Sequence, residues 1–388
     1  MGTGIDMVAE LIERTSDLRR AFREHNFSPD SIKKDTKRYS MKEAAEMVGR
    51  SHQAIRDAEA DGRAPPPELG PNGRRLGFTL KQVNTLRDVF GTRPSRGEGD
   101  EPVILAVQNF KGGVAKSTLS THLAEYLARA GYRVLLVDCD SQASTTGTFG
   151  YLPDQDLAEE DTLLPYFRDE QDSLHYAIRE TYWDGLSLIP ANLHLYQAEY
   201  EMAHEVTAET FSMLRDGIST VADGFDIVLL DPPPALGMIS LNVIYAANAL
   251  LIPMPPAMYD FSSTISFLTM LHETMGVLER AVGTIDYKFL KLVISRFDEN
   301  KSAQTALVDL AESEFGNAML SAKLRESAEI VTAGNLQRTV YELEKATTSS
   351  QVHKRCLNIL DSVNREIEQL IRRSWPSHAK ELRKQGLL

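Results

Sequence analysis

The stretch ILAVQNFKGGVAKST (residues 104–118) decides the fold. A short apolar run comes first, two glycines follow at Gly112 and Gly113, and a helical pattern begins near Lys116. Glycines let the backbone turn its N–H groups inward, and the helix that follows adds its positive end to them. A strand, a glycine turn and a helix in this order predict a phosphate-binding loop. The strict pattern has a second glycine where this chain has Ala115.

The residues of this loop have expected roles in binding a nucleotide. We expect the Lys116 ammonium to reach the β- and γ-phosphates and the Ser117 hydroxyl to bind Mg²⁺. The ordinary pattern needs one lysine, and Lys111 has no role within a single chain. The expected nucleotide-binding residues of the loop are Lys111, Gly112, Gly113, Val114, Ala115, Lys116, Ser117 and Thr118.

Continuous apolar runs recur after this loop and alternate with helical segments. They lie at residues 133–138, 186–190, 226–231, 249–254 and 289–295. Strands that are apolar along their whole length are buried on both faces, as in parallel sheets covered by helices. We therefore expect an α/β fold of the P-loop NTPase class, with a mostly parallel sheet and helices on both of its faces.

Aspartates close two of these strands. VDCDSQAS (137–144) holds Asp138 and Asp140, which we expect at the carboxyl edge of the sheet, where ligands bind in open α/β folds. Asp140 is the better candidate to orient an attacking water, whereas capping or structural support explains Asp138 equally well. Asp231 ends DIVLLD (226–231), as expected of a strand that holds Mg²⁺ through water. Two lysines and Mg²⁺ can neutralise the charge that phosphoryl transfer develops.

The composition fits a globular protein with two different tasks. The 388 residues are 42% hydrophobic and 25% charged, and the two cysteines, Cys139 and Cys356, have no metal-like spacing. So few cysteines favour a reducing cytoplasm, and no apolar run approaches the length of a membrane span. Residues 1–99 hold 18 Lys and Arg against 15 Asp and Glu, whereas the remaining residues hold 24 against 40. A slightly basic N-terminal part thus precedes an acidic remainder of net charge −16.

Four segments are expected along the chain. Residues 1–36 contain an opening helix, 37–91 a compact helical module, 92–102 a polar linker, and 103–388 the nucleotide-binding domain with a C-terminal helix. The apolar residues of the opening helix recur at helical spacing, at Ile5, Val8, Leu11, Ile12, Leu18 and Phe22. Packing on its own domain and a contact in a dimer explain this apolar face equally well.

The second segment has the pattern of a winged helix-turn-helix. A turn at Gly49 and a helix capped by Ser51 are followed by GPNGRRLGFT (70–79), which predicts a hairpin with Asn72-Gly73 at its tip. The second helix is expected to enter the major groove of DNA while the hairpin holds phosphates. The DNA-binding candidates are Ser51, His52, Gln53 and Arg56 on the helix and Arg74 and Arg75 on the hairpin. The alternative is a small helical packing domain.

Three motifs in order, KGGVAKS, VDCDSQAS and FDIVLLDPPPALG, resemble those of the deviant Walker ATPases of the ParA/MinD superfamily, over residues 103 to about 345. The resemblance makes Lys111 the signature lysine, which reaches across an ATP-sandwiched homodimer to the phosphates of the partner. It makes Asp140 the catalytic aspartate of switch I, where this chain has Ser141 in place of the usual proline and therefore a less rigid backbone. The expected switch residues are Asp138, Asp140, Gln142, Asp231, Pro232 and Gly237.

A fourth stretch, PMPPAMYDFSS (253–263), lies where this family places residues near the base, with Pro255 and Met258 as candidates. It resembles the long, plasmid-encoded partition ATPases (ParA, and RepA of repABC replicons), and GRRLGFT resembles MerR-like wings. A proline-rich strand exit without a ligand is the alternative. The resemblance implies a plasmid partition ATPase that uses ATP and Mg²⁺, with weak turnover stimulated by a centromere-binding, ParB-like partner.

The same resemblance implies that the ATP dimer binds DNA without sequence preference, that the winged helix represses the protein's own operon, and that the location is cytoplasmic and nucleoid-associated. Its basic DNA-binding candidates are Lys301, Lys323, Arg325 and Arg338, although solvated surface explains them equally well. The C-terminal stretch is broken by Pro376 and poor in apolar residues, so no membrane partner is expected. Two other functions stay open: a nucleotide-sensing transcriptional repressor, and a chromosome or cell-pole positioning ATPase of the same superfamily.

Overall fold

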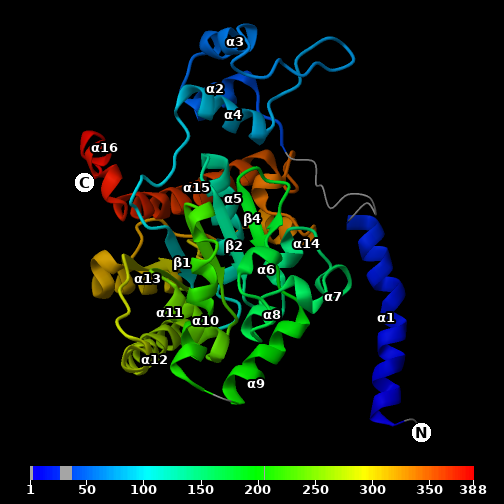
Figure 1. Ribbon diagram of the computed structural model, residues 1–388, viewed down its shortest axis with the longest axis vertical. Helices are drawn as coiled ribbons and strands as arrows, with labels where there is room; N and C mark the ends of the chain where they lie inside the picture. Colours follow the sequence, from blue (N-terminus) through cyan, green and yellow to red (C-terminus); the bar gives the residue numbers. More distant parts are fainter. Residues whose placement is uncertain (1–2, 27–36, 205) are drawn as a thin grey trace.

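A seven-stranded sheet forms the centre of the computed structural model, which describes residues 3–26, 37–204 and 206–388. Its order is β3-β4-β2-β5-β1-β6-β7, and within the described chain every pairing is parallel except that of β3 with β4 (Figure 1). The strands are β1 (Val103–Val107), β2 (Val134–Asp138), β3 (Arg179–Glu180), β4 (Leu186–Ile189), β5 (Ile227–Asp231), β6 (Ala249–Met254) and β7 (Phe289–Ile294). The expected α/β fold with a mostly parallel sheet is confirmed.

Parallel pairing brings the ends of several strands to one edge of the sheet. Asp138 of β2 pairs in register with Asp231 of β5. Strand β1 lies between β5 and β6, so the loop that follows Val107 opens at the same edge. Polar ligands bind at this carboxyl edge in open α/β sheets, because the strands point their last carbonyls and the following helix N-termini there.

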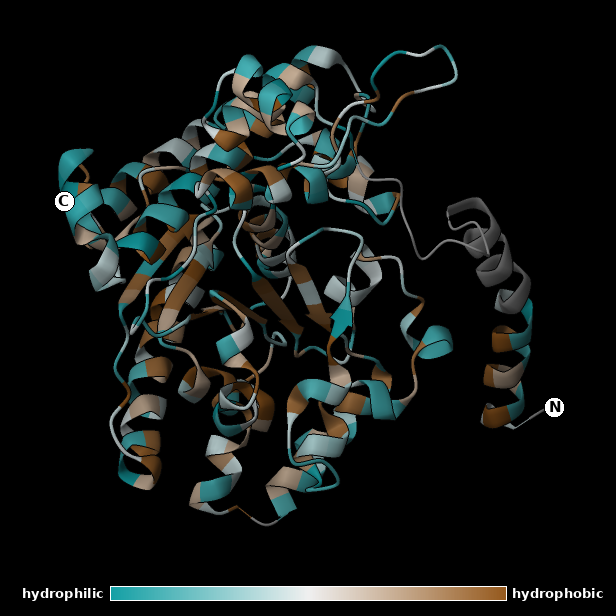
Figure 2. Ribbon diagram, turned by 45° about the horizontal axis from the view of Figure 1, so that its top comes forward, coloured by the Kyte–Doolittle hydropathy of each residue, from teal (hydrophilic) through white to brown (hydrophobic). Residues whose placement is uncertain are grey.

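Helices cover both faces of the sheet. Alternate strand residues face opposite cores, so that Leu105 packs in the core that includes α5 and α15, whereas Ala106 packs in the core that includes α10 and α11. Most strands of the sheet are apolar in Figure 2, as expected for a sheet buried on both faces, whereas the short edge strand β3 (Arg179–Glu180) is hydrophilic. The helices of this domain are α5 (Lys116–Ala130), α6 (Ser144–Thr148), α7 (Pro153–Asp156), α8 (Leu164–Phe167), α9 (Tyr196–His204), α10 (Ala208–Ser219), α11 (Met238–Ala246), α12 (Met258–Val282), α13 (Ser302–Phe315), α14 (Ala328–Asn335), α15 (Ser350–Arg373) and α16 (Ala379–Lys384).

A small helical module precedes this domain. It consists of α2 (Met41–Val48), α3 (His52–Ala60) and α4 (Leu80–Phe90), and the segment between α3 and α4 projects from the body in Figures 1 and 2. The hairpin expected there forms, because the Gly73 N–H donates to the Gly70 carbonyl at 2.9 Å and the Gly70 N–H to the Arg74 carbonyl at 2.8 Å. Gly73 has a φ of 69°, a left-handed conformation that glycine adopts without cost.

The module is attached to the sheet domain by buried polar contacts. The Arg87 guanidinium on α4 donates to the Arg129 carbonyl near the end of α5 at 3.0 Å, and the Asn84 amide donates to the Asp184 carboxylate at 2.7 Å. Burial lowers the pKa of Arg87 to about 10. The connecting segment 92–102 is also bound, since the Arg96 guanidinium donates to the Phe225 carbonyl at 3.1 Å. The two units are therefore in contact along α4 as well as through the linker.

Helix α1 (Gly4–Asn26) lies at the side of the body in Figure 1. The apolar residues expected on one face are exposed, with Ile5 81% and Leu11 60% accessible. The side chains of Leu18 and Phe22 lie outside the described residues. Packing on the chain's own domain is thus not seen for Ile5 and Leu11. Within the described part of the chain, no helix is both long and apolar enough to span a membrane.

Candidate nucleotide-binding site

The loop between β1 and α5 contains two left-handed residues. Gly113 has a φ of 74° and Ala115 a φ of 76°. A side chain at positive φ costs on the order of 1–3 kcal/mol, which explains why the strict loop pattern has glycine at the position of Ala115. Lys116 is the first residue of α5, so the loop leads directly into the positive end of that helix. This is the geometry expected of a phosphate-binding loop.

Lys116 lies beneath the loop. Its side chain is only 7% exposed, and its ammonium donates to the Lys111 carbonyl at 3.3 Å. Burial lowers the pKa of Lys116, and the Asp231 and Asp140 carboxylates oppose this shift. The cation therefore stands between the loop backbone and the acidic strand ends, where phosphate oxygens would complete its coordination.

Lys111 stands at the rim of the loop, with 38% of its side chain exposed. Its N–H donates to the Asn109 side chain at 3.0 Å, which fixes the backbone. Its ammonium forms an ion pair with Asp260, in the first turn of α12. The sequence pointed to no partner for Lys111 within its own chain, and the structure supplies one.

Asp138 and Asp231 lie together in the interior, at the ends of their paired strands. Asp138 accepts hydrogen bonds from the Thr146 N–H at 2.8 Å and the Thr146 hydroxyl at 2.7 Å, contacts that support α6. Asp231 accepts from the Thr145 hydroxyl at 2.6 Å. Burial raises the pKa of both carboxyls, and the neighbouring Asp231 raises that of Asp138 further.

These groups fit a divalent cation. The Ser117 hydroxyl is hydrogen-bonded to Asp231 and lowers the pKa of that carboxyl against the effect of burial. Hydroxyl and carboxylate oxygens are the hard donors that Mg²⁺ prefers, and the ion keeps several of its waters. A cation here would also relieve the repulsion between the two buried carboxylates. Ser117 and Asp231 are therefore suited to hold Mg²⁺ beside the phosphates.

Asp140 lies in the turn after β2 at the same edge. Its carboxylate accepts from the Gln142 N–H at 3.0 Å, and its own N–H donates to Asp138 at 3.1 Å. Ala143, the residue that precedes α6, has a φ of 53°. Hydrogen bonds of the turn thus hold Asp140 at this edge although proline is absent from position 141.

The segment after β5 is held by a residue that sequence reasoning missed. Glu199 on α9 accepts hydrogen bonds from the N–H groups of Met238 and Ile239, at the start of α11. A Cβ on Gly237 would come within 2.2 Å of this carboxylate, so a side chain there would displace Glu199 from its present position. Burial raises the pKa of Glu199, and the two N–H donors oppose that rise. Pro232 and Gly237 therefore belong to a segment anchored by α9.

A cavity of about 600 Å³ lies beside the loop. Its lining includes Gly113, Ala115 and Thr118 from the loop side, and Arg296, Asp298 and Leu324 from the segments after β7. The Arg296 guanidinium donates to the Gly113 carbonyl at 3.0 Å and so ties the two walls together. Pro255 and Met258 do not line this cavity, and Met258 is 63% exposed at the start of α12. This cavity next to the loop is a space suited to a base.

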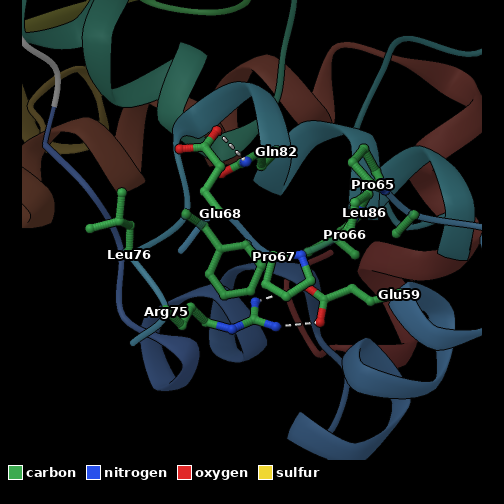
Figure 3. A pocket seen from close by; sticks show the side chains of 11 residues that line it. Glu59, Pro65, Pro66, Pro67, Glu68, Arg75, Leu76, Gln82 and Leu86 are labelled. Carbon is green, nitrogen blue, oxygen red and sulfur yellow. Dashed lines mark hydrogen bonds and ion pairs between the residues drawn. The ribbon is translucent and has the colours of Figure 1, made fainter. Parts of the chain in front are cut away.

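The DNA-binding candidates of the small module fall into two groups. His52, Arg56 and Arg74 are exposed. Arg75 is instead paired with Glu59 of α3 (Figure 3). Its guanidinium also lies over the Phe78 ring, 4.8 Å from the ring centroid. This pair fixes the hairpin to the second helix.

The two other candidates on this helix make local hydrogen bonds. Ser51 caps α3 by accepting from the Ala54 N–H at 3.2 Å, as expected. The Gln53 amide donates to Asp57 at 2.8 Å. Both side chains are exposed but already have partners on their own helix.

The basic candidates nearer the C-terminus are largely neutralised by ion pairs. Lys301 lies 3.3 Å from Asp298, Lys323 2.6 Å from Glu312, and Arg325 2.5 Å from Glu299. Arg338 is half-buried. The structure therefore does not bring these four residues together as one exposed basic surface.

The loop, its buried lysine and the aspartates at the strand ends place the chain among P-loop nucleotide-binding proteins. A family model described as an AAA domain matches residues 103–281. Protein SopA of Escherichia coli K12 is 34% identical over 385 residues, which cover 96% of this chain and 98% of that protein. The putative replication protein A of Rhizobium rhizogenes is 30% identical, over 94% of this chain and 95% of its own length. The chain therefore belongs to the ParA family of deviant Walker ATPases, the family of the plasmid partition ATPases.

Solved structures share this fold. A partition protein has a TM-score of 0.60 with 22% identity, and the match covers 94% of this chain and 99% of that one. A putative plasmid partition protein from Borrelia burgdorferi, bound to AMPPNP, has a TM-score of 0.53 with 21% identity, over 69% of this chain and 100% of that one. The first of these matches extends over the N-terminal module as well as the sheet domain.

Proposed function

We propose that this chain binds and hydrolyses ATP at the loop between β1 and α5, with weak turnover. Lys116 holds the β- and γ-phosphates, Ser117 and, through water, Asp231 hold Mg²⁺, and Asp140 orients the attacking water. The cavity beside Thr118 accepts the base, because Thr118 lines both the loop and the cavity. Bound Mg²⁺ supplies charge neutralisation during phosphoryl transfer.

Two copies of the chain close over two nucleotides in the proposed cycle. The observation that carries this step is the position of Lys111, which is partly exposed at the rim of the loop and pairs its ammonium with Asp260 of α12. An exposed cation at this rim can reach the phosphates of a facing copy. The closed dimer then binds DNA without sequence preference, and a centromere-binding partner stimulates hydrolysis and release.

The test of this step is the variant Lys111→Ala. We expect it to bind a fluorescent ATP analogue but to lose ATP-dependent association, measured by sedimentation, and ATP-dependent DNA binding. The variant Lys301→Ala, which removes a cation already paired with Asp298, is the matched control. Association of Lys111→Ala at the wild-type level would rule out the sandwich.

The small module is proposed to bind an operator and so to repress the chain's own operon. Exposed His52 and Arg56 on α3 are placed to read bases, Arg74 on the hairpin is placed to hold a phosphate, and Arg75 positions the hairpin through Glu59. The exposed apolar face of α1 is proposed to pack against the same helix of a second copy, which would match the two halves of a palindromic operator. Footprinting with Arg56→Ala and Arg74→Ala tests this assignment.

One observation favours a second candidate function, the nucleotide-sensing repressor. Arg87 joins the module to the far end of α5, the helix that begins at Lys116 in the nucleotide site. Nucleotide-dependent footprinting of an operator, without ATP-dependent binding to random DNA, would favour sensing over partition.

A further inference from the structure

A polar groove lies far along the chain from the nucleotide site, between the edge strand β7 and helix α15. It has a volume of about 600 Å³, and its floor includes the short 3₁₀ segment Gly316–Ala318 that follows α13. Basic side chains on both walls face it: Lys291 from β7, and Arg365 and Arg373 from α15. None of the proposed steps above uses these residues.

Among the described residues, the three cations have no acidic partner. In the part of the chain that the structure describes, no carboxylate forms an ion pair with Lys291, Arg365 or Arg373, and Lys291 donates instead to the Asn317 carbonyl. This contrasts with Lys323 and Arg325, whose charges are offset by glutamates. Unpaired cations stand out in residues 100–388, which carry a net charge of −16.

Glu366, the one acidic side chain among the described residues that line the groove, is bonded to backbone N–H groups rather than to the cations. Glu366 accepts hydrogen bonds from the Ser321 and Ala322 N–H groups, both at 2.8 Å. Its two oxygens therefore bind the backbone of the facing segment and hold α15 against it. A carboxylate used in this way leaves the neighbouring cations free to bind an anion from solution.

The spacing along α15 suits a repeating anion. Arg365, Gln369 and Arg373 are four residues apart and lie along one face of the helix, so the two guanidiniums are roughly 12 Å apart along its axis. Neighbouring phosphates of one DNA strand rise by about 3.4 Å, so this separation spans between three and four phosphate steps. No aromatic side chain is among the residues that line the groove, so nothing there stacks on a base.

We propose that this groove binds the phosphate backbone of duplex DNA and carries part of the sequence-independent binding. The inference rests on the proposed function, because it names the surface that the ATP-closed dimer uses. Cations spaced along a helix and polar donors without base-reading groups give affinity without sequence preference. The paired candidates Lys301, Lys323 and Arg325 are then surface residues outside this contact.

The test uses the full-length protein with ATP and Mg²⁺ and a labelled random-sequence duplex. The double variant Arg365→Ala/Arg373→Ala removes two phosphate contacts, so the slope of log affinity against log salt is expected to become shallower by about 2. At about 0.1 M salt the affinity is expected to fall on the order of 50-fold. The control Lys323→Ala/Arg355→Ala removes two cations that are already paired with Glu312 and Glu299, and it should bind as the wild type does.

ATP-analogue affinity and ATP-dependent dimerisation of the groove variant are measured in parallel and are expected to be unchanged. Equal DNA affinity and salt slope in the groove variant and the wild type would overturn the assignment. The assignment would also be overturned if the groove variant bound DNA as the wild type does but lost binding to vesicles of anionic phosphatidylglycerol. Equal DNA binding of the wild type with and without ATP would instead count against the proposed cycle, and the variant comparison would still decide the groove. A wild type that binds no duplex overturns both.

Discussion

In the proposed cycle the Lys111 ammonium has two partners: Asp260 of its own chain and the phosphates bound to a second copy. The ion pair with Asp260 holds the ammonium at the rim of the loop. Before it can reach the phosphates of a second copy, this pair has to break. Asp260 therefore opposes closure, and the free energy of that one contact enters the dimerisation equilibrium directly.

The variant Asp260→Asn keeps the shape of the side chain but removes its charge. Partly exposed ion pairs contribute about 0.2–1 kcal/mol each, and two such pairs break in each dimer, so we expect ATP-dependent dimerisation to strengthen roughly two- to thirtyfold. Sedimentation equilibrium with a non-hydrolysable ATP analogue measures this change, and Asp260→Glu, which keeps the charge, is the control. Weaker dimerisation of Asp260→Asn would mean that Asp260 positions the lysine for closure instead.

Some residues of the site could be predicted from the sequence because they are adjacent in it. The loop 111–118 and the strand-end aspartates Asp138 and Asp231 follow from local pattern and from the rule that parallel strands end at one edge. Glu199, Asp260 and the cavity wall at Arg296 come from other elements, and only the packing of α9, α12 and β7 brings them to the loop.

A buried histidine connects helix α5 to the segment at Val340. His122 Nδ1–H donates to the Thr118 carbonyl at 2.7 Å, and its Nε2 accepts from the Val340 N–H at 3.2 Å. These two contacts require the neutral ring, since a protonated Nε2 would face another donor. Burial lowers the pKa of His122 to about 4, and the bond to Thr118 opposes this only in part.

The pKa of His122 predicts an acid-sensitive fold. A histidine in the unfolded chain is protonated near pH 6.5, whereas His122 in the folded chain is protonated only near pH 4. The contribution of the neutral His122 ring to the free energy of unfolding is therefore complete above pH 6.5 and is lost as the pH falls towards 4. Urea unfolding should show a loss of about 2 kcal/mol for the wild type between neutral pH and about pH 5, and His122→Gln should lack this part. The exposed His204→Gln should behave as the wild type, and an identical pH profile of His122→Gln would contradict the assignment.

The helical periodicity of α1, α5 and α15 and the turn at Gly73 could also be predicted at the scale of elements, since each depends on neighbouring residues. The fixing of the hairpin to α3 could not. It depends on Arg75 meeting Glu59, sixteen positions away, and a basic residue on a hairpin looks the same in sequence whether it is paired or free.

At the scale of the whole molecule, Arg87 holds the small module against the sheet domain. Its guanidinium donates to the Met47 carbonyl at 3.2 Å, the Asn84 side chain at 2.7 Å and the Arg129 carbonyl at 3.0 Å, so it joins both units. Hydrogen bonds to a charged group contribute roughly 1.5–3 kcal/mol each, and removal of one partner leaves buried carbonyls unsatisfied.

The variant Arg87→Ala is expected to separate the two units without unfolding either. Calorimetry should then resolve a lower transition for the module, and hydrogen exchange of α4 should speed up while that of β1 and β5 does not. Arg50→Ala, whose guanidinium bonds only within the module among the described residues, is the control. A single transition at the wild-type temperature would show that α4 and segment 92–102 dock the module without Arg87.

The end of the chain closes over its own connecting segment. The Trp375 indole donates to the Glu101 carbonyl at 3.0 Å, and Ser377 binds Asp100, so residues near the C-terminus secure the segment that leads from the module to β1. Trp375 is synthesised 274 residues after Glu101, to which it is bonded. During synthesis both the module and the strands of the sheet are therefore in the growing chain well before this contact can form. A chain cut before Trp375 would carry both units but lack the contact that holds the segment between them.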